Sequence, residues 1–206
     1  MCGRFALSAP AAQLIEFFEL DECADFLSRL NIAPGTDIPV IRQSPEGKRV
    51  LHLLRWGLLP HWVKDPQSVS HPINARLETL REKPYFRSAY QKRRCLVPAS
   101  GFYEWKREGK RKEPYYFSND SGELMAMAGL WESWKAPDGS ILRTVCLITT
   151  DANAVMQPIH DRMPVFIGKQ DWRAWFTGEM TLDQQTESAA SKSPSLQRTP
   201  ADKMLL

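Results

Sequence analysis

Cysteine is scarce in this chain. Its 206 residues include four cysteines, irregularly spaced and without any Cys-x-x-Cys pair or nearby histidine cluster: Cys2, Cys23, Cys95 and Cys146. Neither a disulfide framework nor a zinc site is indicated by this pattern. Long apolar runs are missing as well, since no stretch approaches the length of a membrane span and no basic region followed by an apolar stretch opens the chain. These absences favour a soluble protein of a reducing cytoplasm, without a membrane partner.

The chain also lacks a large excess of one charge. It contains 27 Lys or Arg and 24 Asp or Glu, which gives a formal net charge of +3. The charges are unevenly distributed: residues 81–112 contain eleven Lys or Arg and only three Asp or Glu. Such a basic band indicates either a solvated face or a surface that binds a polyanion. With 43% hydrophobic residues, the chain can build one core of useful size.

The pattern of apolar residues predicts an α+β fold, a single domain with a predominantly antiparallel β-sheet or barrel-like core and peripheral helices. Strands are expected in "RCLVPASGFYEW", "EPYYFS", "LMAMAGLW" and "RTVCLITT". Helices are expected in "SAPAAQLIEFFEL", in "KQDWRAWF" and in "DANAVMQPIH", where Asp151 is the expected cap. Periodicity fades after residue 176, so we expect the domain to span residues 1–176 and a polar, poorly ordered tail to follow in 177–206.

The opening "MCGRF" places a cysteine at the second position. Removal of Met1 would leave the free α-amine of Cys2 beside its own thiol. Such a 1,2-aminothiol can close on one aldehyde carbon to form a five-membered thiazolidine ring. Taken alone, a cysteine at position 2 is more often an ordinary terminal residue.

Three further stretches place a reactive or anion-binding residue beside residues that form turns or stop strands: "PINARLET", "SGFYEWK" and "IHDRMP". Each also has a structural interpretation. Asn74 suits a turn, Glu104 suits the solvent face of a strand, and His160 suits a helix end.

Together with "MCGRF", these stretches resemble the signature of the SOS-response-associated peptidase (SRAP) family, whose members capture abasic sites in single-stranded DNA. The resemblance extends from Cys2 to about Phe176 and includes "NIAPGT", "WGLLPHW", "INAR", "GFYEW", "ITTDAN" and "IHDRMP" in the family's order. Several independent motifs in a fixed order are much more specific than one short pattern. The resemblance implies an SRAP-like fold, single-stranded DNA with abasic sites as the partner, and no metal or organic cofactor.

The resemblance also implies roles for four catalytic residues. Cys2 is expected to form the covalent link, first as an imine through its amine and then as a thiazolidine through its thiol. Asn74 is expected to hold the amine, Glu104 to shuttle protons, and His160 to protonate the departing sugar oxygen. An α-amine has a pKa of roughly 7.7–8.0 and a thiol about 8.5, so both groups are partly reactive near neutral pH.

A single strand also needs contacts to its phosphates and bases. The resemblance suggests phosphate contacts by three arginines and base contacts by a proline and two tryptophans: Arg4, Arg76, Arg162, Pro34, Trp56 and Trp62. Arg162 can instead pair internally with Asp161, and core packing is the favoured alternative for Trp56.

The C-terminal segment departs from the family's pattern, because the expected closing strand is not recognisable in "SPSLQRTPADKMLL". Two other functions remain alternatives. One is a Cys2-dependent autopeptidase or amidohydrolase that uses the thiol as nucleophile and the amine as base. The other is a non-covalent single-stranded DNA-binding module. We also expect lyase and autopeptidase activities and a monomeric state. We expect the protein to associate with the bacterial nucleoid when it acts.

Overall fold

The five-stranded barrel at the centre of the computed structural model is built from β4 (Asp37–Gln43), β5 (Arg49–Trp56), β7 (Arg94–Ala99), β10 (Met125–Lys135) and β11 (Ile141–Asp151). Antiparallel pairings connect β5 to β4, β4 to β7, β7 to β10 and β10 to β11. The ring closes through a parallel pairing of β11 with β5, in which Thr144 lies opposite Arg55. The structure describes residues 2–109, 111–181, 184–186 and 194–201.

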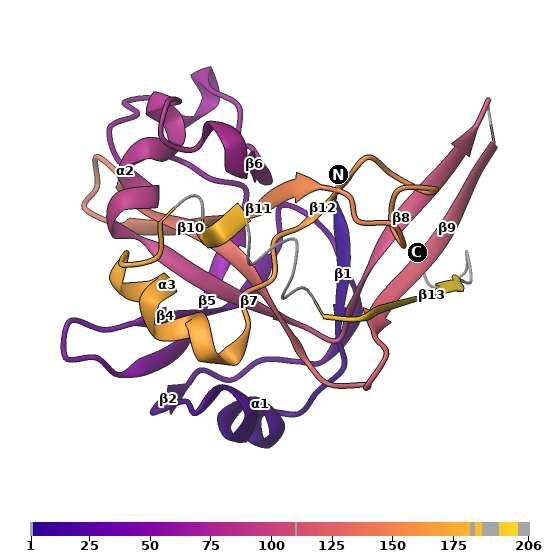
Figure 1. Ribbon diagram of the computed structural model, residues 1–206. Helices are drawn as coiled ribbons and strands as arrows, with labels where there is room; N and C mark the ends of the chain where they lie inside the picture. Colours follow the sequence, from indigo (N-terminus) through magenta and orange to yellow (C-terminus); the bar gives the residue numbers. More distant parts are fainter. Residues whose placement is uncertain (1, 110, 182–183, 187–193, 202–206) are drawn as a thin grey trace.

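A second sheet lies against the barrel, in the order β13-β9-β8-β1-β3. Its strands are β1 (Arg4–Leu7), β3 (Arg29–Ile32), β8 (Gly101–Glu108), β9 (Arg111–Asn119) and β13 (Leu196–Pro200). Figure 1 shows β8 and β9 as a long hairpin that extends away from the barrel, with the N-terminus beside β12 (Arg162–Pro164). In β8, the Tyr116 ring lies where a Cβ on Gly101 would be, only 2.2 Å away, so this close approach requires glycine.

Short helices cover the outside of the barrel. They are α1 (Ala11–Phe18), α2 (Pro84–Lys92) and α3 (Trp172–Thr177). Pro84 begins α2, where a missing N–H costs no helical hydrogen bond. Trp175 of α3 packs onto the barrel and donates its indole N–H to the Cys95 carbonyl at 2.9 Å. The remaining short elements are β2 (Glu22–Cys23), β6 (Asn74–Arg76) and the 3₁₀ turns Pro66–Ser68, Leu77–Thr79 and Lys169–Asp171.

The fold class expected from the sequence is confirmed: one domain, mostly antiparallel β-structure, a barrel core and peripheral helices. The four predicted strand segments correspond to β7 to β11. No helix within the described residues is long and apolar enough to cross a membrane.

The helix predicted over residues 151–160 is wrong. Asp151 is the last residue of β11 and pairs with Arg162 of β12. The following residues form turns, and the Asn153 side chain accepts hydrogen bonds from the backbone N–H groups of Val155 and Met156 at 3.1 and 3.0 Å. An Asn side chain that bonds the backbone locally stabilises a turn instead of a helix.

The prediction of a poorly ordered tail is wrong for part of residues 177–206. Strand β13 pairs along its whole length with β9, from Leu196 opposite Asn119 to Pro200 opposite Tyr115. Gln185 is fully buried and hydrogen-bonds to Tyr90 and Met180. Residues 182–183, 187–193 and 202–206 lie outside the described part of the chain. The C-terminal segment therefore contains a strand that the sequence did not reveal.

Candidate functional site

Cys2 lies two residues before the start of β1, and its side chain is completely buried. Its thiol donates to the Arg4 carbonyl oxygen, with the sulfur 3.8 Å from that oxygen. Strand β1 runs antiparallel to β8, and Arg4 lies opposite Tyr103, the residue before Glu104. The pairing of these two strands therefore brings the first residues of the chain beside Glu104.

Asn74 approaches Cys2 from β6, a short strand that runs parallel to β11 with Asn74 opposite Leu147. Its side-chain amide donates to the Cys2 carbonyl oxygen at 3.0 Å. The expected contact of Asn74 is with the amine of Cys2, so the atom contacted differs from the expectation. The other end of this amide, Asn74 Oδ1, is buried and accepts no hydrogen bond from a described residue.

Glu104 is nearly fully buried on β8. Burial raises the pKa of the Cys2 thiol well above its usual range, and the negative charge of Glu104 raises it further. The thiol is therefore neutral around physiological pH, and it needs a proton acceptor before it can react as a thiolate.

His160 follows the Asn153 turn and reaches the same region. Its Nδ1 accepts the backbone N–H of Arg162 at 3.0 Å and also lies 2.8 Å from a carboxylate oxygen of the exposed Asp161. In the neutral ring, Nδ1 can accept the first of these bonds, and in the protonated ring it can donate to Asp161. His160 and Glu104 line one cavity of about 230 Å³, so residues from distant motifs share a site.

Three other residues line this cavity: Trp105, Arg107 and Lys112, from the two strands of the β8–β9 hairpin. They are not among the predicted site residues. The basic band at residues 81–112 was the signal that could have identified Arg107 and Lys112, since it already suggested a surface for polyanions. With two cations beside a carboxylate and an imidazole, the cavity suits an anionic ligand that undergoes proton transfer.

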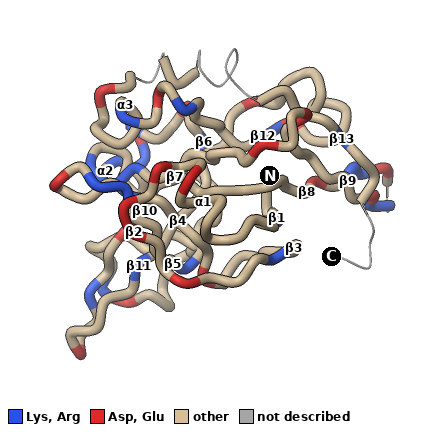
Figure 2. Tube along the Cα trace, turned by 90° about the horizontal axis from the view of Figure 1, so that it is seen from below, with Lys and Arg blue, Asp and Glu red and all other residues tan. Residues whose placement is uncertain are grey.

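The basic band itself is not one continuous surface. Figure 2 shows its Lys and Arg on α2 at one side of the molecule and on the β8–β9 hairpin at the other. Arg94 is buried between Tyr90 and Trp175, and Arg93 forms an ion pair with the buried Glu132 at 2.8 Å. The hairpin is thus the part of the band that adjoins the site.

The structure does not support Arg162 as a phosphate contact. Only 8% of the residue is exposed, and its guanidinium binds both carboxylate oxygens of Glu78, at 3.0 and 2.9 Å, together with Asp151 and the Thr149 carbonyl. The alternative pairing with Asp161 is also not observed, because Asp161 lies against His160. Arg162 instead connects the turn that carries His160 to β11 and to the residues after β6.

We predict that Arg162→Gln lowers the free energy of unfolding by about 2–3 kcal/mol, because it leaves three groups without their charged hydrogen-bond donor. Urea denaturation measures this loss. The single change Asp161→Asn is the control and should alter stability by less than about 0.5 kcal/mol, because Asp161 is exposed. An Arg162→Gln protein of unchanged stability would contradict the structural role.

Trp56 does not have the expected role of a base contact. Only 1% of the residue is exposed, so it cannot stack on a base in this structure. Its ring packs edge-on against Phe5 at 5.4 Å, and its N–H donates to the Ile73 carbonyl. The core-packing alternative is thus what the structure shows. Trp62, by contrast, is 51% exposed beside Tyr85, and Pro34 is exposed in the turn before β4.

The two remaining arginines lie on β1 and β6, two residues after Cys2 and Asn74 respectively. Arg4 is half-buried in β1 and donates to the Asn31 side-chain oxygen at 2.8 Å. Arg76 ends β6 and is exposed, and it forms no ion pair with a described residue. Of these two arginines, Arg76 is therefore the exposed cation that an anionic ligand can reach without competition from a described carboxylate.

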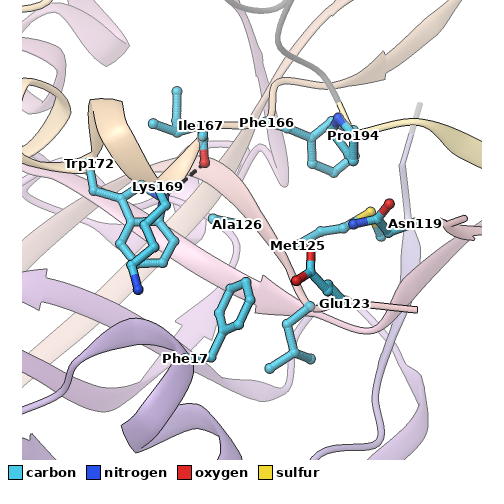
Figure 3. Close-up of a pocket in the computed structure, with 12 residues that line it drawn as sticks. Phe17, Asn119, Glu123, Met125, Ala126, Phe166, Ile167, Lys169, Trp172 and Pro194 are labelled. Atoms are coloured by element: carbon cyan, nitrogen blue, oxygen red, sulfur yellow. Dashed lines mark hydrogen bonds between the residues drawn. The ribbon is translucent and has the colours of Figure 1, made fainter. Parts of the chain in front are cut away.

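A separate cavity of about 200 Å³ lies between α1, the start of β10 and residues 166–172, and it contains none of the site residues (Figure 3). There the Trp172 indole N–H donates to the Ile167 carbonyl at 2.9 Å. No group of His, Cys, Asp and Glu suited to a metal ion occurs within the described ranges, and all four cysteines are free thiols.

The fold and site define a class of β-barrel protein in which an amide and a carboxylate from other strands lie beside the cysteine after the initiator methionine, and an imidazole from a turn shares a cavity with that carboxylate. The chain belongs to the SOS response associated peptidase (SRAP) family, whose model matches residues 1–204. That match extends beyond the expected domain boundary at residue 176, as the pairing of β13 does.

Curated relatives carry the name abasic site processing protein. YoqW of Bacillus subtilis is 42% identical over 185 residues, which cover 88% of this chain and 82% of the relative. YedK of Escherichia coli is 33% identical over 199 residues, covering 93% and 86%.

Solved structures agree with the fold. A protein from Bacteroides thetaiotaomicron matches with a TM-score of 0.86 and 24% identity, covering 98% of this chain and 93% of that one. A phage-related protein from Bordetella bronchiseptica matches with a TM-score of 0.76 and 27% identity, covering 98% and 95%.

Proposed function

We propose that this protein senses abasic sites in single-stranded DNA and crosslinks to them through Cys2, forming a thiazolidine that shields the lesion. The observation that carries the proposal is the enclosure of Cys2 by Asn74 and Glu104 in a chain whose relatives are named abasic site processing proteins. A 1,2-aminothiol is the group that such a site needs, because the ring-opened sugar presents an aldehyde.

The reaction begins after removal of Met1 frees the α-amine of Cys2. His160 protonates the departing ring oxygen of the sugar while the C1 hydroxyl loses its proton to water, so that the bond from C1 to the ring oxygen breaks and the aldehyde is exposed. The amine adds to the aldehyde carbon to give a carbinolamine, and loss of one water molecule, with a proton supplied by Glu104, gives the imine. Asn74 Oδ1, buried and without a donor among the described residues, would accept a hydrogen bond from the amine.

Ring closure follows when the Cys2 sulfur adds to the imine carbon. The thiol proton moves to the nitrogen, with Glu104 as the carrier, so that one carbon–sulfur bond forms and no further atom is lost. The raised pKa of the buried thiol supports this order, since the amine is free to react while the thiol is still protonated.

The crosslink is tested by intact mass before and after incubation with a single-stranded oligonucleotide carrying one abasic site. Loss of Met1 and a stable one-to-one adduct, absent with an intact oligonucleotide, is the expected result. Loss of Met1 without any adduct would instead favour the autopeptidase or amidohydrolase alternative. Equal non-covalent binding of intact and abasic strands, without an adduct, would favour the binding-module alternative.

Arg76 supplies a test of the DNA contact that does not depend on the covalent step. On an intact single strand, Arg76→Gln should reduce the slope of log affinity against log salt by about 0.7, the value for one phosphate contact. Fluorescence anisotropy at several salt concentrations measures the slope. The control is Arg173→Gln, which removes an exposed charge on α3 and should leave the slope unchanged. Equal slopes in wild type and Arg76→Gln would exclude this contact.

A further inference from the structure

Four residues converge at one end of the barrel: Arg42 of β4, His52 of β5, Trp131 of β10 and Arg143 of β11, here called the barrel-mouth cluster. The Arg42 guanidinium lies over the Trp131 ring, 4.3 Å from its centre. The charges of Arg42 and Arg143 both act on His52. Arg42 and Trp131 are thus in contact, and Arg143 lies near enough for its charge to act on Arg42 and His52, although the four residues come from four different strands.

The strand registers explain this convergence. His52 pairs with the residue two positions before Arg42, so these two side chains share one face of β4 and β5. Arg143 pairs with the residue two positions after Trp131, so these two share one face of β10 and β11. The pairing of β5 with β11 brings these two faces together. The contact of Arg42 with Trp131 and the effect of both arginine charges on His52 link the four strands across the ring. The cluster therefore lies on the inner side of the barrel, at its end.

The cluster carries positive charge that the protein does not neutralise. Within the described residues, neither Arg42 nor Arg143 forms an ion pair. Burial and then the charge of Arg143 lower the pKa of Arg42, and burial together with both arginines lowers the pKa of His52, against an opposing effect of Glu22. Two arginines that repel each other, Arg42 partly buried and Arg143 exposed, favour an anion between them.

Two buried polar atoms of the cluster also lack a hydrogen-bond partner among the described residues, namely Arg42 Nε and His52 Nδ1. Buried polar groups without partners are rare in native proteins, and each costs about 1–3 kcal/mol. A ligand oxygen that reaches one of these atoms would remove this cost.

A cavity of about 670 Å³ opens beside the cluster, lined by Arg42, His52 and Trp131. Lys48 and Lys92 add positive charge to its wall, while Glu22 and Glu46 carry the opposite sign. The volume falls within the range of sites for small organic ligands. The cavity of Figure 3 lacks such an excess of charge, because its Lys169 is paired with Glu19 at 2.8 Å.

The cluster lies away from the Cys2 site. Arg143 precedes Leu147, the β11 partner of Asn74, by four residues, which corresponds to about 13 Å along a strand. Figure 1 shows β4, β5, α2 and α3 in the left part of the view, whereas the N-terminus and β12 lie to the right of centre. A ligand here would not occupy the crosslinking site.

We propose that the barrel-mouth cluster is a second anion site, which binds the phosphate group of a nucleotide or of a nucleic-acid strand between Arg42 and Arg143, with Trp131 as an aromatic wall. Paired guanidinium groups form charge-assisted hydrogen bonds with phosphate oxygens, and an aromatic ring is a platform for a base. The inference goes beyond the crosslinking function and does not depend on it.

Calorimetric titration with inorganic phosphate, thymidine monophosphate and the dinucleotide TpT tests the site. We expect binding with a Kd of about 1 mM or tighter for at least one of them. The strongest ligand identifies the source, because the monophosphate is a free phosphomonoester and TpT carries a strand-like phosphodiester. Arg143→Gln should weaken that binding about tenfold, and Arg42→Gln together with Arg143→Gln should abolish it.

The matched control is Arg198→Gln, because Arg198 also lies over an aromatic ring, Tyr115, but on β13 and away from the cavity. It should bind as wild type does. A second readout locates the ligand: the indole ¹⁵N–H signal of Trp131, assigned by its loss in Trp131→Phe, should shift during the titration. No binding by wild type, or equal binding by wild type and both Arg143 variants with an unmoved Trp131 signal, would overturn the proposal.

Discussion

Replacing Cys2 with Ala is expected to abolish the stable adduct with an abasic single strand. The α-amine would still be present after removal of Met1, so the variant can form an imine but cannot close the ring. We therefore expect that borohydride traps a reduced product in the variant, while no adduct survives without reduction. Intact mass spectrometry distinguishes the two products.

The fold should tolerate this change. Cys2 is fully buried, but the loss of one sulfur atom costs about 1 kcal/mol, which a single domain survives. Cys23→Ala is the matched control, because Cys23 is a partly exposed thiol that a non-specific reagent would reach more easily. A stable adduct formed by Cys2→Ala, or lost in Cys23→Ala, would refute the assignment of Cys2.

Glu104→Gln is expected to slow adduct formation by a factor of about 10²–10⁴, the usual contribution of a general acid–base group. The sign of the effect is informative. The Glu104 charge raises the pKa of the Cys2 thiol, so its removal lowers that pKa and favours the reactive thiolate. If Glu104 acted only through its charge, the variant would react faster, whereas a proton carrier predicts that it reacts more slowly.

Single-turnover kinetics with a fluorescent abasic oligonucleotide measure the rate. Glu108→Gln is the control on the same strand, since Glu108 is exposed and pairs with Lys106. The control should react at the wild-type rate. The melting temperatures of Glu108→Gln and Glu104→Gln show whether both variants are folded. A Glu104→Gln protein that reacts at the wild-type rate or faster would exclude Glu104 as the proton carrier.

Most of the β-structure could be predicted from the sequence, because alternating apolar residues and punctuation by Gly and Pro are local signals. The helix predicted at residues 151–160 failed for a local reason too, since Asn153 satisfies the backbone of a turn. Strand β13 could not be recognised, because four of its five residues are exposed and its stability comes from pairing with β9. Barrel closure was equally hidden, since it depends on a parallel pairing between β5 and β11.

For the candidate site, the motifs identified Cys2, Asn74, Glu104 and His160 as residues of interest, but not the contacts among them. Asn74 contacts the Cys2 carbonyl because β6 lies beside β11, and this neighbourhood is a long-range property. Trp105, Arg107 and Lys112 were missed as members of the cavity for the same reason.

By itself, the sequence determined the chemistry available to this protein. It supplies a cysteine after the initiator methionine, a carboxylate, an imidazole and several arginines, on an antiparallel β framework. Only the tertiary structure decided which of these side chains a ligand can reach. Arg76 is exposed while Arg162 binds Glu78, and Trp62 is half-exposed while Trp56 fills the core. The physical reason is that residue type fixes charge and shape locally, whereas burial and ion pairing depend on segments that are distant in the chain.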